Sequence, residues 1–167
     1  MAEAIARGVT GSGLLKPTEI LAADISPQRR SLFADQLKIR AIDDAAAVAS
    51  HCGTLLLAVK PQQMAAILPA VGDVAKPDSL IITIAAGIST SHISRAMGKR
   101  SAWRVVRAMP NTPMLVGKGM VALCRGEHAS ASDLAMARRI FESAACVTEV
   151  TESMMDAVTA LDRKSVV

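Results

Sequence analysis

Two stretches of the chain, residues 54–59 and 80–85, are apolar at successive positions instead of at alternate ones. A β-strand that is apolar on both faces needs covering on both faces, which is typical of a parallel sheet between two layers of helices. Shorter apolar runs, bounded by turn-forming residues, predict further strands. These lie at residues 19–24, 39–42, 103–108, 119–124 and 146–150.

Helical patterns separate these strands. Apolar residues spaced three or four positions apart, with Ser, Asp or Pro at the start, predict amphipathic helices. Asp43 or Asp44 is expected to cap an Ala-rich helix, and Pro69 indicates a kink or an early end in the next one. The alternation predicts an α/β fold with a doubly wound, mostly parallel, Rossmann-like sheet. The other expected helices cover residues 1–10, 27–37, 60–74, 89–97, 130–144 and 151–161.

Three predicted strands are followed by short segments of small, rigid or polar residues: 58–61, 85–87 and 107–113. Pro110 and Pro113 fix φ and lack an N–H, so we expect a strand to end near residue 107 and a rigid polar loop to begin. Loops at the carboxyl ends of parallel strands are where open α/β sheets bind ligands. The alternative is that these segments are stiff connectors without chemistry.

The end of the strand at 19–24 carries candidate nucleotide-binding residues. Asp24 is placed where such sheets accept a ribose hydroxyl, although a surface carboxylate would look the same. Ser26, Arg29 and Arg30 offer a hydroxyl and guanidinium groups that suit a 2′-phosphate. Asp24 favours NAD and the arginines favour NADP, so both cofactors stay open.

Composition narrows the class of protein. A chain of 167 residues can build one domain with a substantial core, and 51% apolar against 20% charged residues excludes a disordered chain. Aromatic residues make up only 2%, which argues against binding single-stranded nucleic acid by stacking. The net charge of +4 is small, and the basic residues are scattered. We therefore expect no nucleic-acid partner.

The three cysteines are far apart and have no metal-ligand spacing with histidine, so no metal site is predicted. This cysteine usage favours a reducing, cytoplasmic compartment. We find neither a secretory signal nor an apolar run of membrane-spanning length, and expect no membrane partner. A Gly-x-Ser-x-Gly elbow and a His-centred triad are also absent from the sequence, so no catalytic residue is named.

Taken together, residues 57–62, 84–88 and 104–113 resemble the dinucleotide-binding domain of pyrroline-5-carboxylate reductase. Residues 1–5 resemble the helix start that follows this family's glycine-rich turn. Residues 148–161 resemble the entry to its second domain. The resemblance covers residues 1–161 in order and at natural spacing.

The resemblance implies an NAD(P)H-dependent reduction of L-1-pyrroline-5-carboxylate to L-proline, in proline biosynthesis, with hydride passing to the ring C=N carbon. It places the adenosine ribose near Asp24 and the nicotinamide near Asn111, and it puts Asp44 where the family has an Asn. The cofactor, NADP or NAD, is expected to contact Asp24, Ile25, Ser26, Arg29, Asp44, Ala58, Val59, Lys60, Pro61, Ile84, Ala85, Ala86, Met109, Pro110, Asn111 and Thr112.

The resemblance also implies departures at both ends. The family begins with a strand and a glycine-rich turn, and Gly8-Val-Thr-Gly-Ser-Gly13 is no substitute because it follows a helix. We expect a truncated NAD(P)-binding domain at 1–150, the start of a connection to a helical dimerisation domain at 151–161, and an unrelated tail at 162–167. Such a fragment of a homo-oligomeric enzyme is expected to be inactive alone and marginally stable.

Two alternatives remain open at this point. The chain could be a non-catalytic nucleotide-binding α/β domain, with an open sheet position where a partner strand pairs. It could also derive from a related reductase that acts on another imine or keto substrate.

Overall fold

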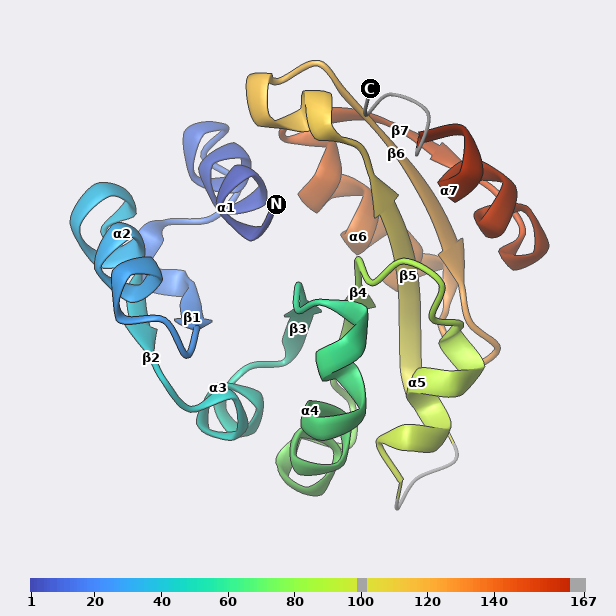
Figure 1. Cartoon of the computed structure of the whole chain (residues 1–167), viewed down its shortest axis with the longest axis horizontal. Helices are drawn as coiled ribbons and strands as arrows, with labels where there is room; N and C mark the ends of the chain where they lie inside the picture. Colours follow the sequence, from blue (N-terminus) through green and yellow to red (C-terminus); the bar gives the residue numbers. More distant parts are fainter. Residues whose placement is uncertain (99–101, 163–167) are drawn as a thin grey trace.

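The computed structural model of the chain describes residues 1–98 and 102–162 (Figure 1). Its helices are α1 (Ala2–Gly11), α2 (Pro27–Leu37), α3 (Ala45–His51), α4 (Pro61–Val74), α5 (Thr90–Ala96), α6 (Ala131–Glu142) and α7 (Met155–Asp162). The strands are β1 (Leu21–Ala23), β2 (Arg40–Ile42), β3 (Thr54–Leu57), β4 (Leu80–Thr83), β5 (Arg104–Pro110), β6 (Gly119–Arg125) and β7 (Ala145–Glu149). Short 3₁₀ turns are η1 (Pro17–Glu19), η2 (Thr112–Val116) and η3 (Glu152–Met154).

The strands form two sheets. Five of them lie in the order β3-β4-β5-β6-β7, and every neighbouring pair is parallel except β5 with β6. The other two, β1 and β2, form a separate parallel pair. This arrangement confirms the predicted α/β class with a mostly parallel sheet, and it explains the uninterrupted apolar runs as strands covered on both faces.

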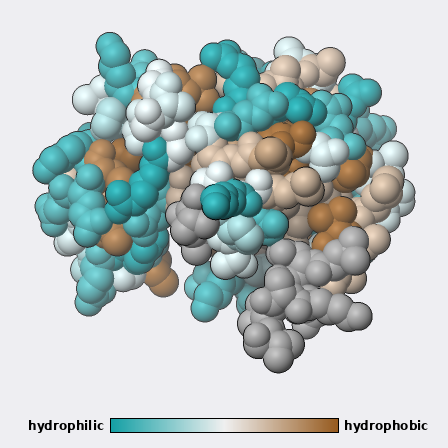
Figure 2. Space-filling model, turned by 90° about the horizontal axis from the view of Figure 1, so that it is seen from above, coloured by the Kyte–Doolittle hydropathy of each residue, from teal (hydrophilic) through white to brown (hydrophobic). Residues whose placement is uncertain are grey.

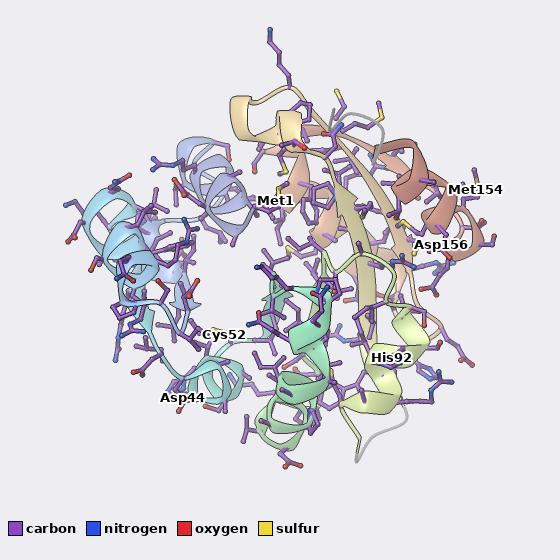
Figure 3. The ribbon with its side chains drawn as sticks, viewed as in Figure 1. Met1, Asp44, Cys52, His92, Met154 and Asp156 are labelled. Atoms are coloured by element: carbon purple, nitrogen blue, oxygen red, sulfur yellow. The ribbon has the colours of Figure 1, made fainter. Side chains whose placement is uncertain are left out.

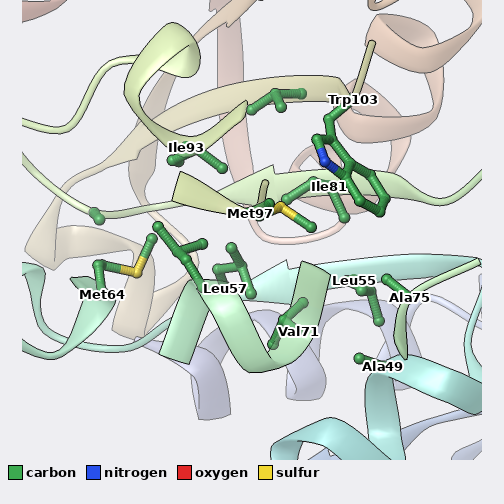
Figure 4. Packing of buried hydrophobic residues seen from close by; sticks show 13 residues of the cluster. Ala49, Leu55, Leu57, Met64, Val71, Ala75, Ile81, Ile93, Met97 and Trp103 are labelled. Atoms are coloured by element: carbon green, nitrogen blue, oxygen red, sulfur yellow. The ribbon is translucent and has the colours of Figure 1, made fainter. Parts of the chain in front are cut away.

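Helices cover both faces of the five-stranded sheet. On one face α3, α4 and α5 bury Ala49, Met64 and Ile93 against Ile81 of β4 (Figure 4). On the other face α1 and α6 pack on Ile82 and its neighbours. Successive residues of β4 thus enter opposite cores, and all four positions of this strand are buried.

Local capping follows the prediction. Ser26 Oγ accepts a hydrogen bond from the Arg29 N–H at the start of α2. Asp44, of the two aspartates considered, caps α3. Ser89 does the same for α5. A serine or aspartate oxygen satisfies N–H groups that the first helical turn leaves without partners, which fixes where each helix begins.

Helix α4 runs to Val74 as predicted, and of the two effects considered for Pro69 the early end does not occur. Its buried residues Leu68 and Val71 hold it on the sheet, so tertiary packing outweighs the hydrogen bond that proline removes. The predicted start of a strand at Glu19 is wrong, because this residue belongs to η1, where its carboxylate accepts the Lys16 N–H at 2.7 Å and closes a capping box before the strand begins.

The predicted strand end near residue 107 is also wrong, since β5 runs on to Pro110. The Asn111 N–H donates to the Met120 carbonyl, so by alternation the nitrogen of Pro110 faces away from β6. On that other side, β4 pairs with β5 only as far as Arg107. Proline therefore sits where no ladder partner needs its N–H, the position that strands tolerate.

Among the residues that the structure describes, no helix combines the length and hydropathy needed to span a membrane.

Candidate nucleotide-binding edge

The strands β3, β4 and β5 run in the same direction, so the segments that follow them meet at one edge of the sheet. Figure 2 looks onto this edge and shows apolar surface interspersed with hydrophilic residues. The structure therefore brings together the ends of three strands that the sequence had singled out separately. Carboxyl edges of this kind are where open α/β sheets bind ligands.

The turn after β1 is held by its own polar groups. Asp24 Oδ1 accepts the Ser26 N–H at 2.9 Å. Arg30 donates from Nη1 to the carbonyl oxygens of Asp24, at 2.9 Å, and Ile25, at 3.1 Å. The Ile25 side chain is 79% exposed. Arg30 thus shapes this turn instead of standing free for a phosphate.

Arg29 is also engaged within the chain. Its Nη1 lies 3.2 Å from Glu3 Oε2, and its guanidinium stacks 5.9 Å above the Phe33 ring centre. Glu3 is bound by Arg7 as well, and these hydrogen bonds, that of Arg7 first, lower the pKa of the Glu3 carboxyl. Arg29 therefore links α2 to α1, a role that sequence reasoning did not foresee.

Asp44 serves as the N-cap of α3. Its Oδ1 accepts the N–H groups of Ala46 at 2.8 Å and Ala47 at 3.0 Å, while the side chain stays exposed. In Figure 3 it lies at the start of α3, away from Met1. The carboxylate is occupied by helix capping, which would compete with a cofactor contact.

The segments after β3 and β4 are small and close to the backbone. Lys60 is exposed at the start of α4, and Val59 packs on the core. Ala85 is only 2% exposed, and its N–H donates to Thr83 Oγ1 at 3.2 Å. Gly87 has a φ of 72°, in the left-handed region that glycine adopts without strain, and turns the chain toward α5.

At the end of β5 the polar residues are partly structural. Asn111 Oδ1 accepts the Met120 N–H at 2.9 Å and so fixes the start of β6. Met109 is half-buried beside Met155 of α7, and Thr112 is exposed at the start of η2. The amide of Asn111 thus holds this turn in a defined shape at the sheet edge.

A cavity of about 340 Å³ opens beside this edge, and sequence reasoning did not find it. It is lined by Gly87, His92, Arg95, Arg107 and Asp156, among others. Arg107 stood where the predicted strand 103–108 overlaps the predicted loop 107–113, and in the structure its side chain is only 3% exposed. The sequence did contain an indication of a buried ion pair. This arginine stands within the apolar run of a strand, and a buried cation needs a carboxylate partner.

The partners of Arg107 come from the end of the described chain. Its Nη1 lies 3.8 Å from Glu152 Oε1, and its Nη2 lies 3.4 Å from Asp156 Oδ1. These acids stand four residues apart, which places them on one side of the η3–α7 segment. Among the described residues no group of three or more His, Cys, Asp or Glu side chains could hold a metal ion.

Comparisons with known proteins agree with this geometry. The family described as NADP oxidoreductase coenzyme F420-dependent matches residues 1–87. Over 160 residues the chain is 36% identical to pyrroline-5-carboxylate reductase of Synechocystis sp., covering 95% of this chain and 58% of that protein. Over 162 residues it is 35% identical to the enzyme of Methanosarcina acetivorans, covering 96% and 59%.

Among solved structures, pyrroline-5-carboxylate reductase from Coxiella burnetii superimposes with a TM-score of 0.90 at 28% identity, covering 96% of this chain and 59% of that one. The chain thus spans about 60% of the length of the relatives it matches. The resemblance on which the sequence prediction rested is confirmed. By the match over residues 1–87 and by its fold, the chain belongs to the F420-dependent NADP oxidoreductase family.

Proposed function

We propose that this chain is the NAD(P)H-binding part of a pyrroline-5-carboxylate reductase, which reduces L-1-pyrroline-5-carboxylate to L-proline in proline biosynthesis. The observation that carries the proposal is the similarity to such reductases over 95% of the chain, together with the three strand ends at one sheet edge. In hydride transfer the cofactor supplies the chemistry, and the protein binds and orients it.

The proposed cofactor lies along the carboxyl edge. Ala85 and Ala86 have side chains small enough for a flat ligand to approach the backbone. Asp24 uses Oδ1 for the Ser26 N–H, which leaves Oδ2 for a ribose hydroxyl. Because Arg29 is paired with Glu3, a 2′-phosphate would have to compete for it. Both NADP and NAD therefore remain in the proposal.

The domain limits belong to the proposal as well. Residues 1–150 would form the cofactor domain and residues 151–161 the connection to a second, helical domain that completes the substrate site of a homo-oligomer. Of the tail proposed at 162–167, residues 163–167 lie outside the described structure. On this view the chain binds cofactor but does not turn over substrate by itself.

Isothermal titration calorimetry with NADPH and, separately, with NADH tests cofactor binding. Ala86→Leu is expected to weaken binding about tenfold or more, because the added side chain fills the space for the ligand (about 1.4 kcal/mol per tenfold change). Ala66→Leu, on the exposed face of α4, is the matched control and should bind as the unmodified chain does. If neither cofactor binds, or if both variants bind equally, the proposed site is wrong.

A reductase assay with L-1-pyrroline-5-carboxylate and NADPH tests whether the chain turns over substrate by itself. We expect no turnover by this chain alone. Full turnover would contradict the role proposed for a second domain while leaving the cofactor site intact.

A further inference from the structure

Arg107 lies between two helices on one face of the five-stranded sheet. Because side chains of a strand alternate between faces, Arg107 shares its face with Val105 and Met109. Val105 packs in the cluster that contains Ile93 of α5, and Met109 packs on the cluster that contains Met155 of α7. Both helices contact β5 (Figure 1). The side chain of Arg107 therefore leaves the sheet where α5 and α7 flank it.

The buried guanidinium of Arg107 has donors without acceptors. Its Nη2 donates to Asp156 Oδ1 over a long 3.4 Å. Its Nη1 lies 3.8 Å from Glu152 Oε1, which is too far for a hydrogen bond. Its Nε has no hydrogen-bond partner among the described residues. A buried charged group with unmet donors costs free energy, so this side chain favours the approach of a further acceptor.

The two neighbouring acids do not supply that acceptor. Both oxygens of Glu152 already accept hydrogen bonds from Thr90, each at 2.7 Å, and these bonds hold the carboxylate at the start of α5. The side chain of Asp156 is 84% exposed, so its carboxylate is largely hydrated. Arg107 therefore keeps donor capacity for a group that is not part of these contacts.

The cavity of about 340 Å³ gives such a group access to Arg107, which forms part of its wall. His92 and Arg95 also line it and stand three positions apart, on one side of α5. Asp156 lines it from α7, and Figure 3 shows His92 and Asp156 on these two helices. The wall thus carries two guanidinium groups and one carboxylate, with an imidazole beside them.

The charge and size of the cavity define the class of ligand. Two guanidinium groups against one carboxylate attract an anion, and Glu152 offsets part of the charge of Arg107, which favours a single negative charge over two. A planar carboxylate matches the fork of a guanidinium group. Half-buried Ile88 adds an apolar part to the wall. The volume is near the lower end of the range for ligand cavities, roughly 300–1,000 Å³.

We propose that the cavity between α5 and α7 binds a small aliphatic monocarboxylate. Its carboxylate accepts hydrogen bonds from Arg107 and Arg95, and its chain lies against Ile88. The residues that line this cavity are different from those expected to contact the cofactor. The inference is therefore independent of the proposed reductase function, and its test uses no cofactor.

Titration of the whole chain with sodium butyrate, followed by two-dimensional ¹H–¹⁵N NMR, tests the site. We expect the Nε–H signal of Arg107 and the amide signal of Gly87 to shift and to saturate, with a dissociation constant in the millimolar range that suits so small a ligand. Butyramide has the same shape without the charge and should cause no such shift. The proposal is overturned if butyrate gives no saturable shift up to about 50 mM, if butyramide binds equally well, or if inorganic phosphate binds more tightly.

A matched pair of variants tests the role of α5. Arg95 and Arg139 are both exposed and both stand in the last turn of a helix, but only Arg95 lines the cavity. Arg95→Gln is expected to weaken butyrate binding about fivefold or more, because a charge-assisted hydrogen bond is lost. Arg139→Gln should bind as the unmodified chain does. Equal affinities of the two variants would contradict the proposal.

Arg107→Lys tests the buried arginine itself. This variant keeps the positive charge but loses the fork, so we expect butyrate affinity to fall about tenfold. Circular dichroism checks that the variant is folded, and if it is not, the comparison of Arg95→Gln with Arg139→Gln still decides. A folded Arg107→Lys variant with unchanged affinity would show that this side chain does not hold the ligand, and would overturn the proposal.

Discussion

Glu152 is bound twice by Thr90: the Thr90 N–H donates to Oε1 and the Thr90 hydroxyl donates to Oε2, each at 2.7 Å. The same carboxylate stands 3.8 Å from the buried guanidinium of Arg107. One acidic side chain therefore joins the start of α5, the middle of β5 and the turn that leads into α7. This junction borders the cavity beside the proposed cofactor edge.

Removal of this carboxylate is expected to destabilise the chain. Glu152→Ala leaves Thr90 without its two hydrogen bonds and leaves Arg107 with Asp156 as its remaining acidic partner, at a cost of about 2–4 kcal/mol. Urea unfolding followed by circular dichroism measures the change. Glu127→Ala, on an exposed turn, is the control and should have no measurable effect. Equal midpoints for the two variants would mean that the junction contributes nothing.

The end of β5 allows a test of which residues direct their backbone N–H groups toward β6. Met109 faces β6 and is paired with Ala122, whereas the nitrogen of Pro110 faces away from β6. Met109→Pro should therefore cost about 3 kcal/mol or more, since it removes a ladder hydrogen bond from a central strand. Pro110→Ala should change the free energy of unfolding by less than about 1 kcal/mol. A severe effect of Pro110→Ala would show that this assignment of facing groups is reversed.

The strands of the sheet show which parts of the fold the sequence could predict and which it could not. The apolar runs around Leu56 and Ile82 predicted parallel strands correctly, because full burial on both faces leaves a clear local signal. Pro110 misled the prediction because proline is tolerated or excluded according to which neighbour its nitrogen faces. That depends on the end of β4 and on the antiparallel β6, neither of which local sequence specifies.

The candidate site likewise has features that the sequence could predict and features that it could not. The three strand ends were predictable, since each follows an apolar run, and parallel strands end at one edge. The pairing of Arg29 with Glu3, and of Arg107 with Glu152, was not predictable from local pattern. Each joins residues more than twenty positions apart whose approach depends on how the helices pack. Basic residues that looked like solvated charges or phosphate ligands are thus partly structural.

A close backbone approach between two helices gives a further prediction. The position where a Cβ of Gly72 would lie is occupied by the Met97 carbonyl, which belongs to the backbone and cannot move aside easily. Gly72→Ala is expected to force α4 and α5 apart and to cost about 1–3 kcal/mol. Gly53→Ala is the matched control, because nothing lies within 4 Å of the added methyl. Thermal unfolding of both variants decides the matter, and a Gly72→Ala variant as stable as its control would contradict the packing.

The cysteines should differ sharply in reactivity. Burial, with the nearby charge of Glu152 adding to it, raises the pKa of the Cys124 thiol to about 11. Cys146 is exposed. At pH 8 only roughly one thousandth of Cys124 would be thiolate, so iodoacetamide should alkylate Cys146 at least about a hundredfold faster.

The raised pKa of Cys124 also fixes a pH dependence with a definite sign. The native state prefers the protonated thiol, so the stability that this group contributes is fully present below its unfolded pKa, near 9.0, and is lost as pH rises toward 11. Urea midpoints should therefore fall over this range more in the unmodified chain than in Cys124→Ala.

Mass spectrometry after timed alkylation at pH 8 measures the predicted difference in reactivity between Cys124 and Cys146. Equal labelling of Cys124 and Cys146 in folded protein would show that the strand β6 is not buried as described.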